Sequence, residues 1–340
     1  MRFFPSVPLL FVLASTTCMS FPAACRSGEP ERIRFDTADY VTIQGTYYPS
    51  DKGKRAPCAI LLHPIGENSQ MEGWDDLAKS LQKKGIAVVT FDFRGHGDST
   101  AVEDKFWYDP TNRTLKSFRP GKLKAQISFK DFTTPRQYAM LLQDIAAARH
   151  FLDQRNDAGE CNSSNLIVVG AESGATLGAL WIWTEWRRPR TNTAAPMVTT
   201  KTRQVEGMDI TCAIWLGITP TVGSGRFNAD SWFHAPVREK VPMLFLYGDG
   251  DKKSATYARH LYTDVLRVTD KDKQMQYTRM RDVKGANRSG RELLNKSLET
   301  VGLIEYYLDT VLADRGANTY VKRDADRTTV MRIPVERLGF

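Results

Sequence analysis

The segment from Asn165 to Leu177 constrains the fold of this chain more than any other. Its sequence is Asn-Leu-Ile-Val-Val-Gly-Ala-Glu-Ser-Gly-Ala-Thr-Leu, in which apolar, β-favouring residues precede a turn of the form Gly-x-Glu-x-Gly. An Ala- and Leu-rich run with several tryptophans follows at once. This order predicts a buried strand, a tight turn and a helix in direct succession. The glycines at both ends of the turn let the helix approach the strand closely, which places Glu172 above the edge of the sheet.

The composition is that of an ordinary globular protein. The chain has 340 residues, of which 41% are hydrophobic and 25% charged, enough for one large α/β domain or two small ones. Its formal net charge of +8 is spread along the chain and is not gathered into a stripe. Because a nucleic-acid interface needs basic residues concentrated on one face, we expect no nucleic acid as a partner.

The N-terminus has the pattern of an export signal. One positive charge at Arg2 is followed by an apolar run from Phe3 to Ala14 and then by small residues. Such segments are removed during export, and this run is too short to span a membrane comfortably. The sequence therefore predicts a signal peptide over 1–24, a secreted or periplasmic protein, and no transmembrane segment in the mature chain. A lipid anchor on Cys18 or Cys25 is the less favoured alternative, because neither lies in a good lipoprotein cleavage box.

The five cysteines do not form a disulfide framework. Cys58 and Cys212 lie in predicted buried strands, whereas Cys25 and Cys161 lie in loop-like contexts and could pair in an oxidising compartment. No cluster of cysteine and histidine has the spacing of a metal site. We therefore expect neither a metal nor another cofactor.

The rest of the pattern alternates buried strands with helices. Apolar runs predict strands over 58–62, 86–92, 210–217, 241–248 and 276–283, preceded by a hairpin over 31–48. Helical spacing predicts helices over 74–84, 135–154, 255–266 and 293–312. In the second of these helices we expect Asp144 and His150 on the solvated side. The alternation predicts an α/β fold with a mostly parallel central sheet flanked by helices, in one domain over 30–313.

Three segments fall outside this alternation. Residues 100–134 have no clear period and mix aromatic with basic side chains, so we expect an insertion after the Arg94-Gly95-His96-Gly97 turn, lying over one edge of the sheet. Residues 187–206 are basic and rich in proline and threonine, which predicts a surface linker. The polar residues 314–340 predict a loosely attached C-terminal tail.

Three further motifs follow predicted strands. Leu-Leu-His-Pro-Ile-Gly-Glu-Asn covers 61–68, Val-Val-Thr-Phe-Asp-Phe-Arg-Gly-His-Gly-Asp-Ser covers 88–99, and Gly-Asp-Gly-Asp covers 248–251. Together with the Gly-x-Glu-x-Gly turn they resemble the alpha/beta hydrolase superfamily, in particular its dienelactone-hydrolase-like and serine-hydrolase-like branches. The resemblance extends over residues 32–312 and implies the alpha/beta-hydrolase fold for this part of the chain.

The resemblance also implies a role for each strand end. Glu172 stands at the position of the nucleophile, Asp251 at that of the acid that orients the catalytic histidine, and Arg288 at that of the histidine itself. The loop His63-Pro64-Ile65 matches the loop that helps to form the oxyanion hole, and Pro64 removes one amide donor from it. His96 lies in a turn that is structural in the superfamily.

These replacements predict a protein that has lost its catalytic triad. Arginine has a pKa above about 12, so it cannot activate the water that would release an ester of Glu172. We therefore expect an exported pseudoenzyme in which Glu172 and Arg288 form an ion pair, with Asp251 as the second partner of the arginine. The former active-site cleft and the 100–134 insertion would bind an unknown small-molecule or protein ligand.

Two alternatives stay open. Ser173, shifted by one residue from the nucleophile position, or an atypical site would make the protein an active serine-type hydrolase of ester or amide bonds. For that reaction the sequence after Asp251 offers a single histidine, His260, in a predicted helix. A purely structural envelope or surface protein would follow if the cleft were filled.

Overall fold

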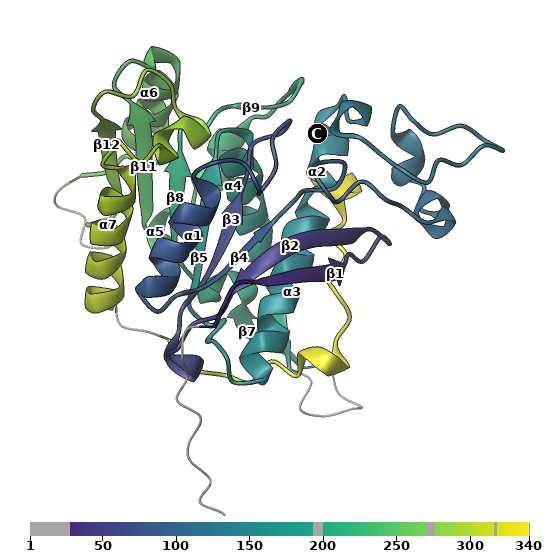
Figure 1. Cartoon of the computed structure of the whole chain (residues 1–340), viewed down its shortest axis with the longest axis horizontal. Coiled ribbons are helices and arrows are strands. Elements are labelled where there is room, and N and C mark those ends of the chain that lie inside the picture. Colours follow the sequence, from purple (N-terminus) through teal and green to yellow (C-terminus); the bar gives the residue numbers. More distant parts are fainter. Residues whose placement is uncertain (1–27, 193–199, 270–275, 316–317, 340) are drawn as a thin grey trace, which may run out of the picture.

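An eight-stranded sheet runs through the centre of the molecule (Figure 1). The computed structural model describes residues 28–192, 200–269, 276–315 and 318–339. In the order in which they lie side by side, the strands of the sheet are β1 (Glu31–Asp36), β2 (Thr42–Tyr48), β4 (Ala87–Phe91), β3 (Cys58–Leu62), β5 (Leu166–Ala171), β8 (Ile210–Leu216), β11 (Met243–Gly248) and β12 (Arg279–Val283). The strands from β4 to β12 pair in parallel, and β1 and β2 form an antiparallel hairpin at one edge. The mostly parallel sheet expected from the sequence is confirmed.

Helices cover both faces of this sheet (Figure 1). The helices are α1 (Trp74–Lys83), α2 (Pro135–Ala139), α3 (Leu142–Asp157), α4 (Ser173–Glu185), α5 (Val237–Lys240), α6 (Lys252–Arg259) and α7 (Thr300–Arg315). Apolar residues of α1 and α7 belong to one core cluster, and those of α3 and α4 to another. Because successive side chains of a strand point to opposite faces, a strand between two helical layers is apolar throughout.

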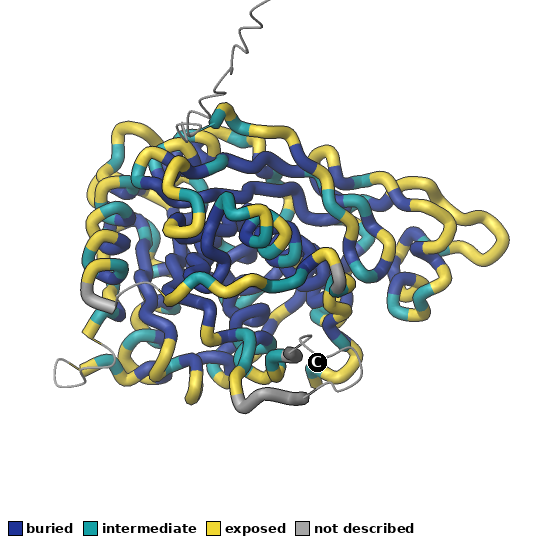
Figure 2. The backbone as a smooth tube through the Cα atoms, turned by 90° about the horizontal axis from the view of Figure 1, so that it is seen from below, coloured by how far each residue is buried: buried dark blue, intermediate teal, exposed yellow. Residues whose placement is uncertain are grey.

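Strand β3 shows this two-sided burial residue by residue. Cys58, Ile60 and Leu62 face the cluster beneath α3 and α4, whereas Ala59 and Leu61 face the cluster beneath α1 and α7. All five are buried, and the backbone tube in Figure 2 is dark blue through the middle of the molecule. The continuous apolar runs of the sequence are therefore the central strands.

The structure divides or shortens three of the predicted helices. The helix expected over 135–154 is interrupted at Met140 and Leu141, between α2 and α3. Helix α6 continues as a π-helix over His260–Val265, and α7 begins only at Thr300, after a 3-10 helix over Gly290–Leu294. The strands and most helices thus lie where the sequence pattern placed them, but helix ends depend on local packing.

The linker expected over 187–206 contains a hairpin. Strands β6 (Pro189–Asn192) and β7 (Thr200–Val205) pair antiparallel, separate from the central sheet. A second small sheet joins β9 (Thr221–Val222) to β10 (Gly225–Arg226). A surface segment satisfies its backbone hydrogen bonds within itself by forming such a ribbon. The sequence of this segment has no apolar alternation that would predict these strands.

Asp144 is buried, which corrects the expectation that it is solvated. Its carboxylate is fully covered and accepts hydrogen bonds from the backbone amide of Arg94 at 2.9 Å and from Nε of the same arginine at 2.8 Å. The Arg94 guanidinium, also fully buried, donates to Asp39 as well. A buried guanidinium needs such partners because its charge has left water. The residues join α3, the turn after β4 and the β1–β2 hairpin.

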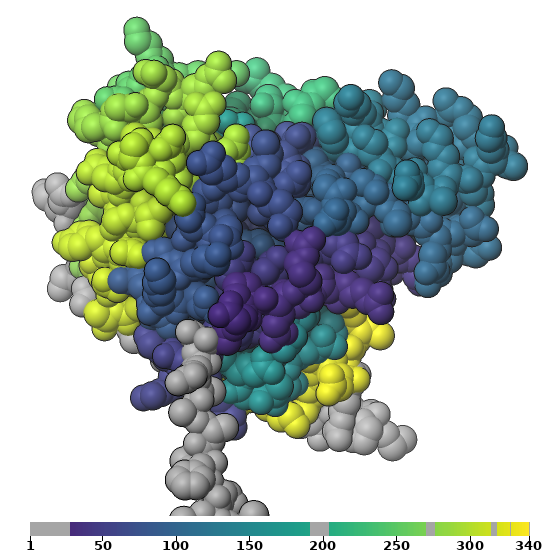
Figure 3. Space-filling view, in the orientation of Figure 1, coloured from purple at the N-terminus to yellow at the C-terminus, as the bar shows by residue number. Residues whose placement is uncertain are grey.

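The 100–134 insertion forms a lobe beside the sheet, at the right of Figures 1 and 3. It contains 3-10 helices over Asp104–Tyr108, Asn112–Thr114 and Phe129–Asp131. Its aromatic residues Phe106 and Trp107 are buried, and their rings meet edge to face. The lobe therefore has an apolar interior of its own, as an ordered insertion does.

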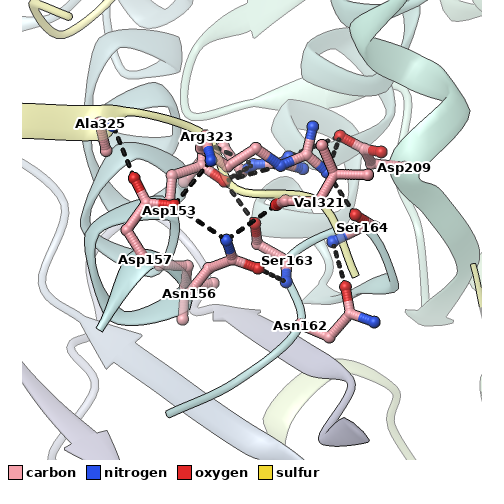
Figure 4. A network of polar contacts seen from close by, with 12 residues as sticks. Asp153, Asn156, Asp157, Asn162, Ser163, Ser164, Asp209, Val321, Arg323 and Ala325 are labelled. Atoms are coloured by element: carbon pink, nitrogen blue, oxygen red, sulfur yellow. Dashed lines mark hydrogen bonds and ion pairs between the residues drawn. The ribbon is translucent and has the colours of Figure 1, made fainter. Parts of the chain in front are cut away.

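The C-terminal tail is anchored along the molecule, which differs from the loose attachment expected. Arg323 and Ala325 donate backbone amides to the Asp157 carboxylate, and the Arg323 guanidinium reaches Asp209 at 3.0 Å (Figure 4). Further along, Gln143 of α3 exchanges two hydrogen bonds with the backbone of Ile333. Polar composition predicted mobility, but these side chains find partners on the domain surface.

In the part of the chain that the structure describes, no helix has both the length and the apolar character needed to cross a membrane. The expected signal peptide over 1–24 and Cys25 lie outside the described residues. Export of the protein therefore stays a prediction.

Candidate functional site

The elbow between β5 and α4 holds Glu172 in a strained backbone conformation. Its φ of 47° and ψ of −114° lie in a region that residues other than glycine rarely adopt. Gly170 and Gly174 permit the turn: a Cβ on Gly170 would lie 2.6 Å from the Cα of Ala175, and one on Gly174 would lie 2.5 Å from the carbonyl oxygen of His63. The sharp strand-to-helix turn is therefore present, with Glu172 at its tip.

The Glu172 side chain packs against Gly290, in the loop after β12. A Cβ on Gly290 would collide with the Glu172 carboxylate, so the site needs a glycine there. Burial raises the pKa of the Glu172 carboxyl, and three negative charges around it raise the pKa further, namely those of Glu67, Asp251 and Glu292. The attraction of Arg288 opposes this rise and does not cancel it. The elbow carboxyl therefore keeps its proton to a higher pH than an ordinary glutamate.

Asp251 is engaged at the start of α6 and in the loop after β12. Its Oδ1 accepts a hydrogen bond from the Ser254 amide at 3.0 Å, and its Oδ2 accepts from the Ser254 hydroxyl at 2.8 Å and from the Ser289 amide at 3.1 Å. Burial alone would raise the pKa of Asp251, but the hydrogen bonds from these two serines outweigh it and lower the pKa. The carboxylate at the acid position thus serves as a helix cap.

Arg288 points into solvent, so the structure does not bring it together with Glu172 in an ion pair. Its side chain is 78% exposed and lies 3.5 Å from Glu292. The next two residues of the loop take its expected place, since Ser289 bonds to Asp251 and Gly290 touches Glu172. A raised pKa at Glu172 is also the opposite of what a close guanidinium produces.

His63, in the loop after β3, and His96, in the turn after β4, are neutral and have both ring nitrogens hydrogen-bonded to backbone groups. His63 donates from Nδ1 to the Pro64 carbonyl at 2.7 Å and accepts at Nε2 from the Phe93 amide at 3.0 Å. His96 donates from Nδ1 to the Arg94 carbonyl and accepts at Nε2 from the Gly66 amide, both at 3.0 Å. Burial lowers the pKa of both rings, that of His63 to about 3. Neither ring has a nitrogen left to accept a proton.

Ser173 is also committed to this loop. Its Oγ accepts a hydrogen bond from the Ile65 amide at 2.8 Å, and only 7% of the residue is exposed. The Ile65 amide, which the resemblance assigns to the oxyanion hole, is therefore already hydrogen-bonded to Ser173. Pro64 has no amide to add.

The chain has five histidines, all within the described residues. His260 lies between two carboxylates, with Nε2 and Nδ1 each 3.0 Å from Asp230 and Asp264. His150 sits on α3 beneath the C-terminal tail, and His234 follows the 3-10 helix over Ala229–Phe233. Within the described residues, no hydrogen bond or ion pair joins any of these three histidines to Ser173 or Glu172.

Sequence reasoning missed three residues that shape this site. Ser254, Ser289 and Gly290 hold Asp251 and Glu172 in place. One signal was available, because Asp-x-x-Ser at 251–254 is a capping pattern at the start of a helix. The roles of Ser289 and Gly290 depend on how the loop turns, which the sequence pattern does not reveal.

Comparison with known proteins places this arrangement in a known architecture. No protein-family model matches the chain, and no curated protein matches it. Among solved structures, an esterase from Pyrococcus furiosus is similar at 12% sequence identity, covering 84% of this chain and 91% of that one with a TM-score of 0.52. A dienelactone hydrolase from Anabaena variabilis is similar at 12% identity, covering 84% and 98% with a TM-score of 0.50. The chain has the alpha/beta-hydrolase fold.

A third similar structure is a putative alpha/beta hydrolase of unknown function from Agrobacterium tumefaciens, at 22% identity, covering 83% of this chain and 97% of that one with a TM-score of 0.50. In terms of the alpha/beta-hydrolase fold, the chain keeps the elbow backbone and a carboxylate at the acid position. Glu172 lies at the tip of this elbow, and the loop after β12 contains no histidine. At identities this low the likeness establishes the fold and leaves the chemistry to the site.

Two cavities open at the carboxyl-end edge of the sheet, and Glu172 is not among the residues that line either of them. One of about 320 Å³ is lined by the loop from Gly285 to Leu298 and by Glu72, and it includes the side chains of Arg288 and Arg291. The other, of about 820 Å³, lies between the segment Ile218–Pro220 and α6 with its π-helix. Ligands of open α/β sheets bind at the carboxyl ends of the strands, where both cavities lie.

Proposed function

We propose that this alpha/beta-hydrolase-fold protein is a pseudoenzyme that binds a small polar molecule at the elbow edge of the sheet. The observation that carries the proposal is the state of the elbow: Glu172 occupies the tip, and no histidine in the described part of the chain is hydrogen-bonded to it. An ester formed on Glu172 would need an activated water for its release. Because both nitrogens of His63 and of His96 are already hydrogen-bonded, neither histidine is free to activate that water.

Binding chemistry follows from the groups that face this edge. The raised pKa of Glu172 lets its carboxyl donate a hydrogen bond when protonated, and the neighbouring cavity carries the guanidinium groups of Arg288 and Arg291. Arg291 is held in place by Glu67 at 3.0 Å, whereas Arg288 is largely exposed. A ligand with a carboxylate or another acceptor oxygen suits such donors.

An active serine hydrolase is the second candidate. It is favoured by the place of Ser173, which follows the elbow residue and contacts the Ile65 amide, and by the names of the similar structures, an esterase and a dienelactone hydrolase. It would require the Ser173 hydroxyl to leave its bond to the Ile65 amide and a base to approach it. The first proposal needs neither change.

A labelling experiment separates the two candidates. Purified protein is incubated with a fluorophosphonate probe and with short acyl esters, alongside Ser173→Ala and Glu172→Gln. We expect no covalent label and ester cleavage no faster than in buffer. Labelling that disappears in Ser173→Ala would establish the hydrolase, and turnover lost in Glu172→Gln would establish an atypical enzyme; either result overturns the pseudoenzyme.

The binding half of the proposal has its own measurement. A panel of small carboxylates is screened by ligand-detected NMR against the wild type, Glu172→Ala and the remote control Glu239→Ala. We expect binding that Glu172→Ala weakens about tenfold, as loss of one hydrogen bond of about 1.4 kcal/mol would do, and that the control leaves unchanged. A panel without a single binder, or binding unaffected at Glu172, would argue for a purely structural protein.

Export belongs to the same proposal, because the N-terminal pattern predicts removal of residues 1–24. Expression of the whole chain in a bacterium followed by fractionation and N-terminal sequencing tests it. A mature chain that starts near residue 25 outside the cytoplasm is expected, and an intact cytoplasmic chain would contradict it.

A further inference from the structure

Two cysteines from distant parts of the chain meet on one face of the sheet. Cys58 begins β3, and Cys161 lies in the loop between α3 and β5. Two backbone hydrogen bonds hold this loop to the start of β3: the Asn162 amide donates to Ala56 at 2.7 Å, and the Cys58 amide donates to Asn165 at 2.9 Å. The two cysteines are therefore neighbours by backbone geometry, independent of their side chains.

Their side chains share the same buried space. Both residues are fully buried and belong to the core cluster beneath α3 and α4. The Cys161 thiol donates a hydrogen bond to the Leu152 carbonyl at 3.6 Å, and the neighbouring Cys58 thiol, followed by burial, raises the pKa of the Cys161 thiol. The ring of Phe151 and the stacked guanidinium of Arg155 cover the neighbouring Tyr47 ring.

Cys212 provides the contrast. It is as deeply buried, in strand β8, but its side chain belongs to the core cluster on the opposite face of the sheet. The sheet therefore separates it from the other two, since a strand presents its side chains to one face or the other. Of the three cysteines in the described residues, the structure brings two together.

We propose that Cys58 and Cys161 form an intramolecular disulfide when the chain folds in an oxidising compartment. A disulfide-bearing oxidant, either a protein or a small molecule, supplies the oxidising equivalents. One thiolate attacks the oxidant and releases a thiol, and the second thiolate then displaces the remaining sulfur. The two cysteines lose two protons and two electrons, and the oxidant's disulfide is reduced to two thiols.

Burial sets the time at which this bond forms. A thiolate is the attacking species, and a covered thiol with a raised pKa reacts slowly. The bond should therefore form before the core closes, and once formed it should resist reduction in the folded protein. It would close a loop of about 100 residues that includes the insertion and α3, which restricts the unfolded chain strongly.

Refolding in a mixture of reduced and oxidised glutathione tests the pairing. The product is denatured, its remaining thiols are alkylated, and its peptides are mapped by mass spectrometry. We expect the peptides of Cys58 and Cys161 to be joined and Cys212 to be alkylated. Cys212→Ala is the matched control and should keep the link, whereas Cys161→Ala should lose it. Oxidised wild type should melt about 5 °C or more above the reduced form, and Cys161→Ala should show no such difference.

Two results would overturn the proposal. In one, Cys58 and Cys161 are both alkylated in protein that has refolded under oxidising conditions. In the other, Cys161 is joined to Cys25, the pairing that loop-like contexts in the sequence suggest. Because the readout is a covalent link, it does not depend on whether the elbow binds a ligand or cleaves an ester.

Discussion

Gly290 leaves room for the Glu172 side chain at the tip of the elbow. Its φ is +76°, and the space where its side chain would lie is filled by the Glu172 carboxylate. Glu172 and Gly290 are far apart in the sequence. Only the folded structure therefore shows that the large Glu172 side chain lies against a residue without a side chain.

Gly290→Ala should destabilise the protein more than its backbone conformation alone explains. Gly121 has nearly the same φ, +75°, with no atom close to a new Cβ, and Gly121→Ala should cost about 1 kcal/mol in the free energy of unfolding. Gly290→Ala should cost about 1–3 kcal/mol more because of the collision. Urea unfolding measures both, and adding Glu172→Ala to Gly290→Ala should remove the excess. An equal cost at both glycines would contradict the packing.

Glu172→Gln should change how stability depends on pH. Because the folded pKa of Glu172 is raised above 4.5, the folded state binds more protons than the unfolded state between the two pKa values. Stability that the neutral carboxyl contributes is therefore lost as pH rises through this window. A glutamine stays neutral, so the variant should match the wild type below the window and be more stable above it, by about 1 kcal/mol or less.

Urea unfolding between pH 4 and pH 8 measures this difference. Glu239→Gln, an exposed glutamate in α5 at the other end of the sheet, serves as the control and should leave the pH profile unchanged. Parallel profiles for the wild type and Glu172→Gln would show that the elbow carboxyl has an ordinary pKa.

At the scale of elements, one buried guanidinium ties a strand end, a hairpin and a helix together. Arg94 follows β4, Asp39 lies in the turn between β1 and β2, and Asp144 is on α3. Burial raises the pKa of Asp144 to about 6 against the attraction of Arg94, whereas the same arginine outweighs burial at Asp39 and lowers that pKa. The charges are kept inside because each has a partner.

Asp144→Ala should therefore be costly. It leaves the fully buried Arg94 with one carboxylate in place of two, and removing one partner of a buried pair typically costs about 3–5 kcal/mol. Lys79→Ala, which breaks an ion pair to Asp75 with both side chains about half exposed, should cost much less, because water screens such a surface pair. Thermal and urea unfolding compare the two. A similar small loss at both sites would mean that Asp144 contributes no more than a surface residue.

At the scale of the whole molecule, the C-terminal tail works as a strap. It leaves α7, is hydrogen-bonded to the loop before β5, and continues along α3 to the insertion (Figures 1 and 4). Near its end Arg332 pairs with Asp109 of the insertion at 3.0 Å. The strap therefore ties the insertion over 100–134, which also lies outside the α/β alternation, to the rest of the domain.

Removal of residues 329–340 should destabilise the protein and loosen the insertion. The deletion exposes the site of Ile333 and Val335, which are 3% and 2% exposed, and each buried side chain of this size contributes about 1.5–3 kcal/mol. A loss of at least about 3 kcal/mol is expected, with faster proteolysis within 100–134. Arg332→Ala leaves the apolar side chains of the tail in place and removes only the ion pairs of Arg332 to Asp109 and Glu336, so it should cost less than about 1 kcal/mol. Unchanged stability after the deletion would show that the tail does not contribute to the folded structure.

The sequence by itself determined the architecture and the identity of the residues at the strand ends. Apolar runs such as 58–62 predicted the central strands because a strand covered on both faces must be apolar throughout. Gly170 and Gly174 predicted the elbow, since a close helix requires them. That Glu172 is the residue at the tip of the elbow could also be read from the sequence.

Only the tertiary structure decided which groups meet. Arg288 turned to solvent while Ser289 and Gly290 faced the site, because a one-residue difference in how a loop turns reverses which side chain points inward. Asp144 proved buried because a distant arginine required a partner. Cys161 lies near Cys58 because the loop before β5 is hydrogen-bonded to the start of β3. Local propensity is encoded in neighbouring residues, whereas contacts between remote side chains are set by the packing of the whole chain.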